Sequence, residues 1–186
     1  MKKIPTLITV IVLAQTYFWI GLSTALTLEF VDRTVTLDGQ IAHNFDLLYS
    51  ERFGELKIDL TAAKVIESFG EPQSKGEQEF WGADGLYHQK WHYPQQGIIL
   101  DMAAEKEQGS ATVSSVRIQA PSPLKTQRGI GIGDSSAKVK QAYGQEEDEA
   151  APISAEYFVA GSVYGGLIFT FKDNIVTEMF LGAIAE

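Results

Sequence analysis

The sequence predicts an α+β protein made of two tandem units, each a short helix followed by an antiparallel sheet. Two observations carry this prediction: an internal repeat, and runs of β-branched and aromatic residues bounded by turn signals. Of the 186 residues, 45% are hydrophobic and 21% are charged. These proportions are typical of a globular protein and too apolar for a disordered one.

The N-terminal segment is a predicted export signal. Lys2 and Lys3 precede an uncharged, mostly apolar run over residues 4–22. Ser23, Thr24 and Ala25 are small residues of the kind that signal peptidase recognises, so we expect residues 1–25 to be removed after Ala25. The run is also barely long enough to span a bilayer, which makes an uncleaved, outward-facing anchor the alternative. The folded part is then expected to be periplasmic or secreted.

Residues 26–54 form the next expected segment. Apolar and polar residues alternate in places over residues 26–30 and 34–37, and Asp38-Gly39 is a favoured turn dipeptide. We therefore expect an N-terminal lead-in that is either a hairpin or an extended chain.

The repeat is clearest where Ile58–Gly70 aligns without gaps on Ile132–Gly144. The fourth residue of each copy, Thr61 or Ser135, carries a hydroxyl that can cap a helix. Each then places a valine and an aromatic residue four positions apart, on one helix face. Each ends in a glycine, Gly70 or Gly144, for which we expect the left-handed conformation that terminates helices.

Strand-like segments follow both predicted helices. They are Leu86–Tyr93, Gly97–Met102 and Val113–Ile118 in the first copy, and Glu156–Val159, Gly166–Phe171 and Val176–Leu181 in the second. Residues 172–174 are the expected tight turn between the last two. The predicted units are residues 55–120 and 129–186, and the proline-containing segment 121–128 is the linker.

The tandem arrangement resembles the β-lactamase-inhibitor-protein-like fold, which small outer-membrane assembly lipoproteins carry as a single unit. The residues that carry the resemblance are Ile58–Pro72, Trp91–Met102, Gly129–Gly144 and Gly166–Leu181. The resemblance implies that the two sheets join into one curved surface, with helices on one face, that grips a protein. The chain has no cysteine, so it departs both from the disulfide-containing inhibitors and from lipid-anchored proteins. No specific target carries over.

The richest candidate site is the predicted strand Leu86–Tyr93. Alternation places Tyr87, Trp91 and Tyr93 on one face, and the polar residues between them on the other. We expect the polar face to bind a partner through Trp81, His88, Lys90, His92, Asp101, Arg117 and Glu178. The alternative is a sheet with one ordinary solvated side.

Several other functions are disfavoured. A net charge of −9 argues against nucleic acid as a partner. His88 and His92 would lie roughly 13 Å apart along a strand, too far to share a zinc ion. The glycines of residues 129–134 do not match a nucleotide-binding fingerprint. The acidic run over residues 146–149 is expected to be a solvated loop. We therefore expect neither a metal nor a cofactor, and no catalytic set.

The leading expectation is an exported, non-catalytic protein-binding module, such as an inhibitor or an envelope assembly factor. Its partner would be another protein in the cell envelope or outside the cell, and it would meet a membrane through residues 4–22 only if that segment is uncleaved. One alternative is a small-ligand carrier whose aromatic pocket uses Trp81 and Trp91. A metal-dependent hydrolase is the weakest alternative.

Overall fold

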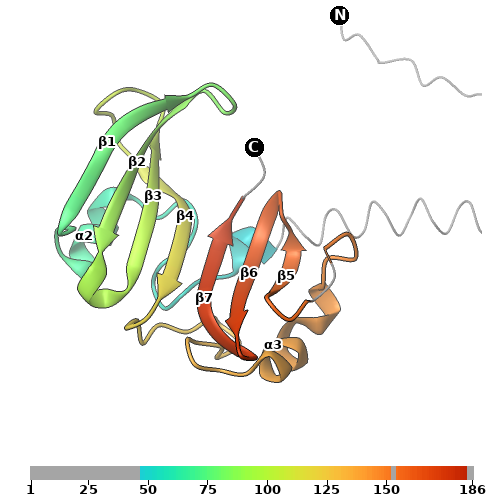
Figure 1. The fold of residues 1–186 in the computed structure, drawn as a ribbon. Helices are drawn as coiled ribbons and strands as arrows, with labels where there is room; N and C mark the ends of the chain where they lie inside the picture. The colour runs from blue at the N-terminus through green and yellow to red at the C-terminus, as the bar shows by residue number, and fades with distance from the viewer. Residues whose placement is uncertain (1–46, 152–153, 184–186) are drawn as a thin grey trace, which may run out of the picture. The chain divides into compact units, whose positions relative to one another are not determined.

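One antiparallel sheet of seven strands, ordered β1-β2-β3-β4-β7-β6-β5, dominates the computed structural model, which describes residues 47–151 and 154–183 (Figure 1). The sheet is not closed, since β1 and β5 form its two edges. The strands are β1 (Ser74–Trp81), β2 (Leu86–Tyr93), β3 (Ile98–Ala104), β4 (Thr112–Gln119), β5 (Tyr157–Ser162), β6 (Gly165–Lys172) and β7 (Ile175–Gly182). The helices are α2 (Ala62–Phe69) and α3 (Ser136–Tyr143), with 3-10 turns η1 (Pro94–Gln96) and η2 (Gly144–Glu146). The fold is mixed α+β and mostly sheet.

The predicted export segment, residues 1–25, lies outside the described residues, as does the lead-in up to residue 46. Within the described part of the lead-in, residues 47–50 are helical, and Phe53 is bridged to both Leu56 and Thr126.

Both repeated helices begin as predicted. The Thr61 hydroxyl accepts a hydrogen bond from the Lys64 amide at 3.4 Å, and Ser135 does the same for Lys138 at 3.3 Å. These bonds satisfy backbone donors that the first helical turn leaves free. Each capping side chain thus supplies a hydrogen-bond acceptor for an amide that has no acceptor within the helix.

The two helix ends differ. Gly70 has a φ of +78°, which is positive as expected, but its ψ of −175° lies outside the left-handed helical region, so only the sign of φ was predicted correctly. The prediction for Gly144 is wrong: its φ of −64° and ψ of −18° are right-handed and helical. The reason is that the chain continues into η2 instead of turning away.

The expected strands are confirmed: Leu86–Tyr93 has the expected bounds, and the ends of the others are shifted by one to three residues. The tight turn is confirmed too, because Asp173 and Asn174 both have the positive φ of a two-residue hairpin turn. β1 is not among the expected strands. Its sequence SKGEQEFW is mostly exposed and lacks an apolar alternation. It is an edge strand, where charged residues are tolerated and disfavour aggregation.

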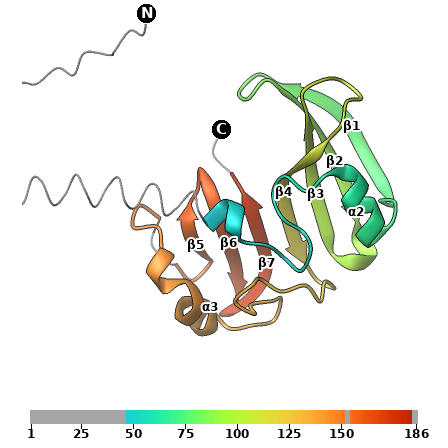
Figure 2. The ribbon, with the colours of Figure 1, turned by 180° about the vertical axis from the view of Figure 1, so that it is seen from behind.

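The main core combines helix residues with alternate residues of the strands. Val65 of α2 and Val139 of α3 belong to the same buried cluster as Trp91, Leu100 and Phe169 of the sheet. In Figure 1 α2 lies behind β2 and β3, and in Figure 2, seen from the opposite side, it lies in front of them. We call the sheet surface that faces this cluster the core face.

The two halves of the sheet meet along β4 and β7. Their paired residues run from Val116 with Leu181 to Gln119 with Glu178. Just beyond this stretch, Gly182 has a φ of +154°, and a Cβ atom there would lie 2.6 Å from the Cβ of Ser115. A glycine is needed because the two strands approach so closely at this point.

Candidate functional site

The surface opposite the core face carries most of the predicted site residues. His88, Lys90 and His92 of β2, Asp101 of β3 and Arg117 of β4 project from it, and we call this surface the polar face. These five side chains and Trp81 line one groove with a volume of about 830 Å³. The seventh predicted residue, Glu178, does not line the groove but forms an ion pair with Arg117. The alternation of the sequence therefore placed these residues together correctly.

His88 is buried in the groove wall, and both of its ring nitrogens are hydrogen-bonded. Only 3% of its surface is exposed, although it is a titratable residue. Its Nδ1 lies 2.5 Å from Oδ2 of Asp101, and its Nε2 lies 2.8 Å from Oδ2 of Asp84. Each ring nitrogen faces a carboxylate oxygen, so both nitrogens donate and the ring is the charged imidazolium.

The pKa of His88 agrees with this geometry. Burial alone would lower the pKa, because it disfavours the charged ring. The hydrogen bonds from Asp101 and Asp84, together with their charges, outweigh burial and raise the pKa above the ordinary value of 6.5. His88 is thus a cation enclosed by two anions.

Trp81 covers one face of this imidazolium. The two rings are nearly parallel, with centres 3.8 Å apart and planes inclined by 11°. An indole face attracts a cation, so the stack stabilises charged His88 further. Trp81 ends β1, and the turn over residues 82–85 leads from it into β2.

Asp84 in that turn is a site residue that the sequence predictions missed. Its Oδ1 accepts a hydrogen bond from the Leu86 amide at 3.0 Å, while its Oδ2 faces His88. Burial opposes ionisation of Asp84, but these hydrogen bonds and the charge of His88 lower its pKa. The available signal was the Asp84-Gly85 turn dipeptide, which places a carboxylate four residues before a histidine.

Arg117 lies where the two halves of the sheet join. It pairs with Glu178 across the β4–β7 ladder, and its guanidinium lies 5.1 Å from the ring centre of Phe180. The positive charge of Arg117 is therefore already paired with Glu178 and stacked on Phe180 within the protein.

Lys90 and His92 differ from the other site residues because no ion pair involves them among the described residues. Lys90 is exposed and stands directly opposite Asp101 in the β2–β3 ladder. Within the described ranges, no group of three or more His, Asp or Glu side chains is arranged to hold a metal ion.

The second half of the sheet presents a different surface on this side. Val159, Ile168 and Phe180 form a small buried cluster against which Ala151 and Val163 pack. The Asp148 amide also donates to the Val159 carbonyl, which fastens the preceding loop to β5. The second half therefore covers this surface with its own residues, whereas in the first half Lys90 is exposed and His92 and Arg117 are partly exposed on the polar face.

Trp91 lies apart from the groove. It is 5% exposed and belongs to the main core, so it does not share a pocket with Trp81. An aromatic pocket built from both tryptophans is therefore absent. The aromatic side chains that do line the groove are Trp81, Tyr49, Tyr164 and Phe180.

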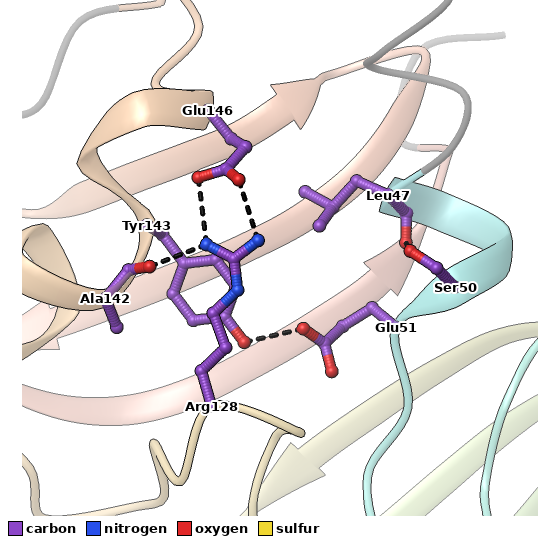
Figure 3. Close-up of polar contacts among 7 residues, drawn as sticks. All are labelled: Leu47, Ser50, Glu51, Arg128, Ala142, Tyr143 and Glu146. Carbon is purple, nitrogen blue, oxygen red and sulfur yellow. Dashed lines mark hydrogen bonds and ion pairs between the residues drawn. The ribbon is translucent and has the colours of Figure 1, made fainter.

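A second polar cluster joins the lead-in to α3 (Figure 3). The Tyr143 hydroxyl donates to Oε2 of buried Glu51 at 2.6 Å, and burial with this bond raises the Tyr143 pKa. Arg128 lies 4.5 Å from the Tyr143 ring centre and forms two hydrogen bonds, of 2.7 and 2.9 Å, to Glu146. Glu146 is therefore buried, and the prediction that it lies in a solvated loop is wrong.

The groove residues are suited to binding more than to proton transfer. In this state His88 has no free nitrogen with which to accept a proton, because Asp101 and Asp84 occupy both. Ser114 and Ser115 line the same groove. The arrangement suits recognition by charge and hydrogen bonding, with an aromatic wall for apolar contact.

No family model, no curated protein and no solved structure matches this chain. Among the residues that the structure describes, no helix is both long and apolar enough to cross a membrane.

Proposed function

We propose that this protein is a binding module for another protein, and that the partner occupies the groove on the polar face. The observation that carries the proposal is the contrast between the two halves of the sheet. The second half covers its surface with the cluster of Val159, Ile168 and Phe180, while the polar residues of the first half line a groove of about 830 Å³ that Tyr164 and Phe180 of the second half also border. The groove is lined by tyrosine, tryptophan, phenylalanine and arginine side chains, which are the residue types enriched at protein interfaces.

The edge of the groove supports this proposal. Tyr164 is 69% exposed and Tyr49 is 59% exposed, yet both line the groove. Tyrosine is among the residues most enriched at interfaces, because a rigid apolar ring ends in a hydrogen-bonding group.

We further propose that the sheet consists of two tandem units of the β-lactamase-inhibitor-protein-like type, with helices on one face. In support, Val113 of β4 exchanges backbone hydrogen bonds with residues 59–60, and Val176 of β7 does so with the aligned residues 133–134.

The pairing irregularities support the same proposal. The β3–β4 register shifts after Asp101, and the β6–β7 register shifts after Thr170. These two residues coincide when Gly97–Met102 is aligned on Gly166–Phe171. A bulge that recurs at the same position is a feature that unrelated hairpins seldom share.

We propose that the module acts in the periplasm or outside the cell, after export by residues 1–25. The support is the charged start, the apolar run and the small residues before residue 26. N-terminal sequencing of the protein from its native envelope tests this. A start at Leu26 is expected; a retained Met1 would indicate the uncleaved anchor.

The binding proposal is tested by capture of envelope proteins on the immobilised mature chain. Tyr164→Ala removes an exposed aromatic ring that lines the groove and should remove the specific partner. Lys140→Glu reverses an exposed charge on α3 and should leave capture unchanged. The proposal fails if no partner is captured specifically, or if both variants retain it equally.

A small-ligand carrier is the second candidate, and the groove volume favours it. About 830 Å³ lies within the range of roughly 300–1,000 Å³ that is usual for small-molecule sites. Trp81 in the wall would report binding through its fluorescence. A saturable change with a small molecule, lost in Trp81→Phe, would support a carrier; no change across a broad panel would exclude it for that panel.

A further inference from the structure

Asp101 has one carboxylate oxygen in use and one without a partner. Its Oδ2 receives the hydrogen bond from His88, but its Oδ1 has no hydrogen-bond partner among the described residues. The side chain is 8% exposed. A buried anionic oxygen without a donor is unfavourable, so a donor is expected to reach it.

Asp101 also lines a smaller cavity of about 170 Å³ beside the groove. Glu77 and Glu79 of β1 line the same cavity, as do His88 and Lys90. Three carboxylates against two cations make the wall negative, and Asp84 at the far side of His88 adds another anion. A cationic donor therefore suits this cavity better than a neutral one.

We propose that this cavity binds a guanidinium group, supplied by an arginine side chain of the partner protein. The inference rests on the proposed function and names the chemistry that the partner brings. One guanidinium N–H would donate to Asp101 Oδ1, and the remaining donors would face Glu77 and Glu79. Guanidinium suits the site better than ammonium because it is planar, has five donors and is weakly hydrated.

Trp81 gives a second reason for a guanidinium. Its indole lines both the groove and the smaller cavity and already stacks on the imidazolium of His88. Arginine stacks on tryptophan more often than lysine does. The cavity thus offers a flat aromatic wall beside carboxylate acceptors.

Lys90 is the competitor within the protein. It stands opposite Asp101 across the β2–β3 ladder and has no ion pair among the described residues. Its positive charge opposes entry of another cation. Lys90→Gln is therefore expected to strengthen guanidinium binding. If Lys90 instead took part in binding the ligand, Lys90→Gln would weaken that binding.

The probe is methylguanidinium, titrated into the full mature chain at pH 7 and followed by the indole N–H resonance of Trp81. The wild-type protein should show a saturable shift that methylammonium does not reproduce. Asp101→Asn should weaken binding about tenfold, because a charged acceptor is replaced by a neutral one. Asp59→Asn is the matched control: it removes one charge from the groove but not from the smaller cavity, and should change affinity by less than about twofold.

Because Asp101→Asn also disturbs His88, its fold is checked by circular dichroism and thermal unfolding. Glu79→Gln provides a second variant that leaves the His88 hydrogen bonds in place, and should weaken binding about threefold. The inference is overturned if folded wild-type protein shows no saturable shift, if Asp101→Asn binds as tightly, or if a crystal soaked in methylguanidinium has only a water on Oδ1.

The two proposals fail separately. Capture of a partner without guanidinium binding would refute only the arginine pocket. Guanidinium binding without any captured partner would refute the protein-binding function and leave the pocket intact.

Discussion

Arg117 of β4 and Phe180 of β7 face each other in the ladder that joins the two halves of the sheet, with the guanidinium 5.1 Å from the ring centre. They also occupy corresponding positions when Val113–Ile118 is aligned on Val176–Leu181. One half thus places a cation, and the other an aromatic ring, at the same point of the joint. The polar groove and the small apolar cluster meet there.

Replacing Arg117 by Ala should destabilise the joint. The change removes the stack on Phe180 and the ion pair with Glu178, but both side chains are partly exposed, so solvent screens the loss. We expect the free energy of unfolding to fall by about 1 kcal/mol. Urea unfolding measures it. Arg52→Ala is the control, because Arg52 is exposed and has no side-chain partner among the described residues; an equal loss there would refute the role of the joint.

His88 should make stability depend on pH in one direction. Its folded pKa is raised above 6.5, so the charged ring stabilises the fold, and this contribution is complete below the unfolded pKa. It should be lost as pH rises from about 6.5 through the folded pKa. Urea unfolding from neutral to alkaline pH should show the decline in the wild-type protein and a flatter profile in His88→Asn. An NMR titration of the ring that found a pKa below 6.5 would contradict this.

Tyr143→Phe should leave buried Glu51 short of a donor. Glu51 keeps its bonds from the amides of Arg52 and Gln127, so the loss is one charge-assisted hydrogen bond of 2.6 Å. We expect a decrease of about 1.5–3 kcal/mol in the free energy of unfolding. Tyr49→Phe removes an exposed hydroxyl and is the matched control. Similar small effects for both variants would show that the buried bond contributes little.

Gly182→Ala should strain the end of the β4–β7 joint. The added Cβ would lie 2.6 Å from the Cβ of Ser115, and alanine rarely adopts a φ of +154°. We expect a loss of about 1–3 kcal/mol, measured by urea or thermal unfolding. Gly82→Ala places a methyl group where no atom lies within 4 Å and should be nearly neutral. A tolerated Gly182→Ala would mean that the strands can move apart.

Local sequence patterns determined much of the fold. The caps Thr61 and Ser135 act on amides three residues away, so the starts of both helices were predictable. The alternation of β2 assigned His88 to the polar face and Trp91 to the core face, because a strand has a period of two. β1 escaped prediction since an exposed edge strand needs no apolar pattern.

Tertiary structure alone decided which residues meet. His88 and Asp101 are 13 positions apart, and Glu51 and Tyr143 are 92 apart, so no local period connects either pair. That β4 pairs with β7, and that β1 and β5 are left as the edges, is likewise a matter of strand order and not of local sequence. The sequence by itself determined the helices and strands other than β1, the faces of those strands and the predicted residues of the polar face. The fold decided that His88 lies between two carboxylates, that one oxygen of Asp101 lacks a donor, and that only the second half covers its own surface. These depend on burial and pairing between distant segments, which local patterns do not encode.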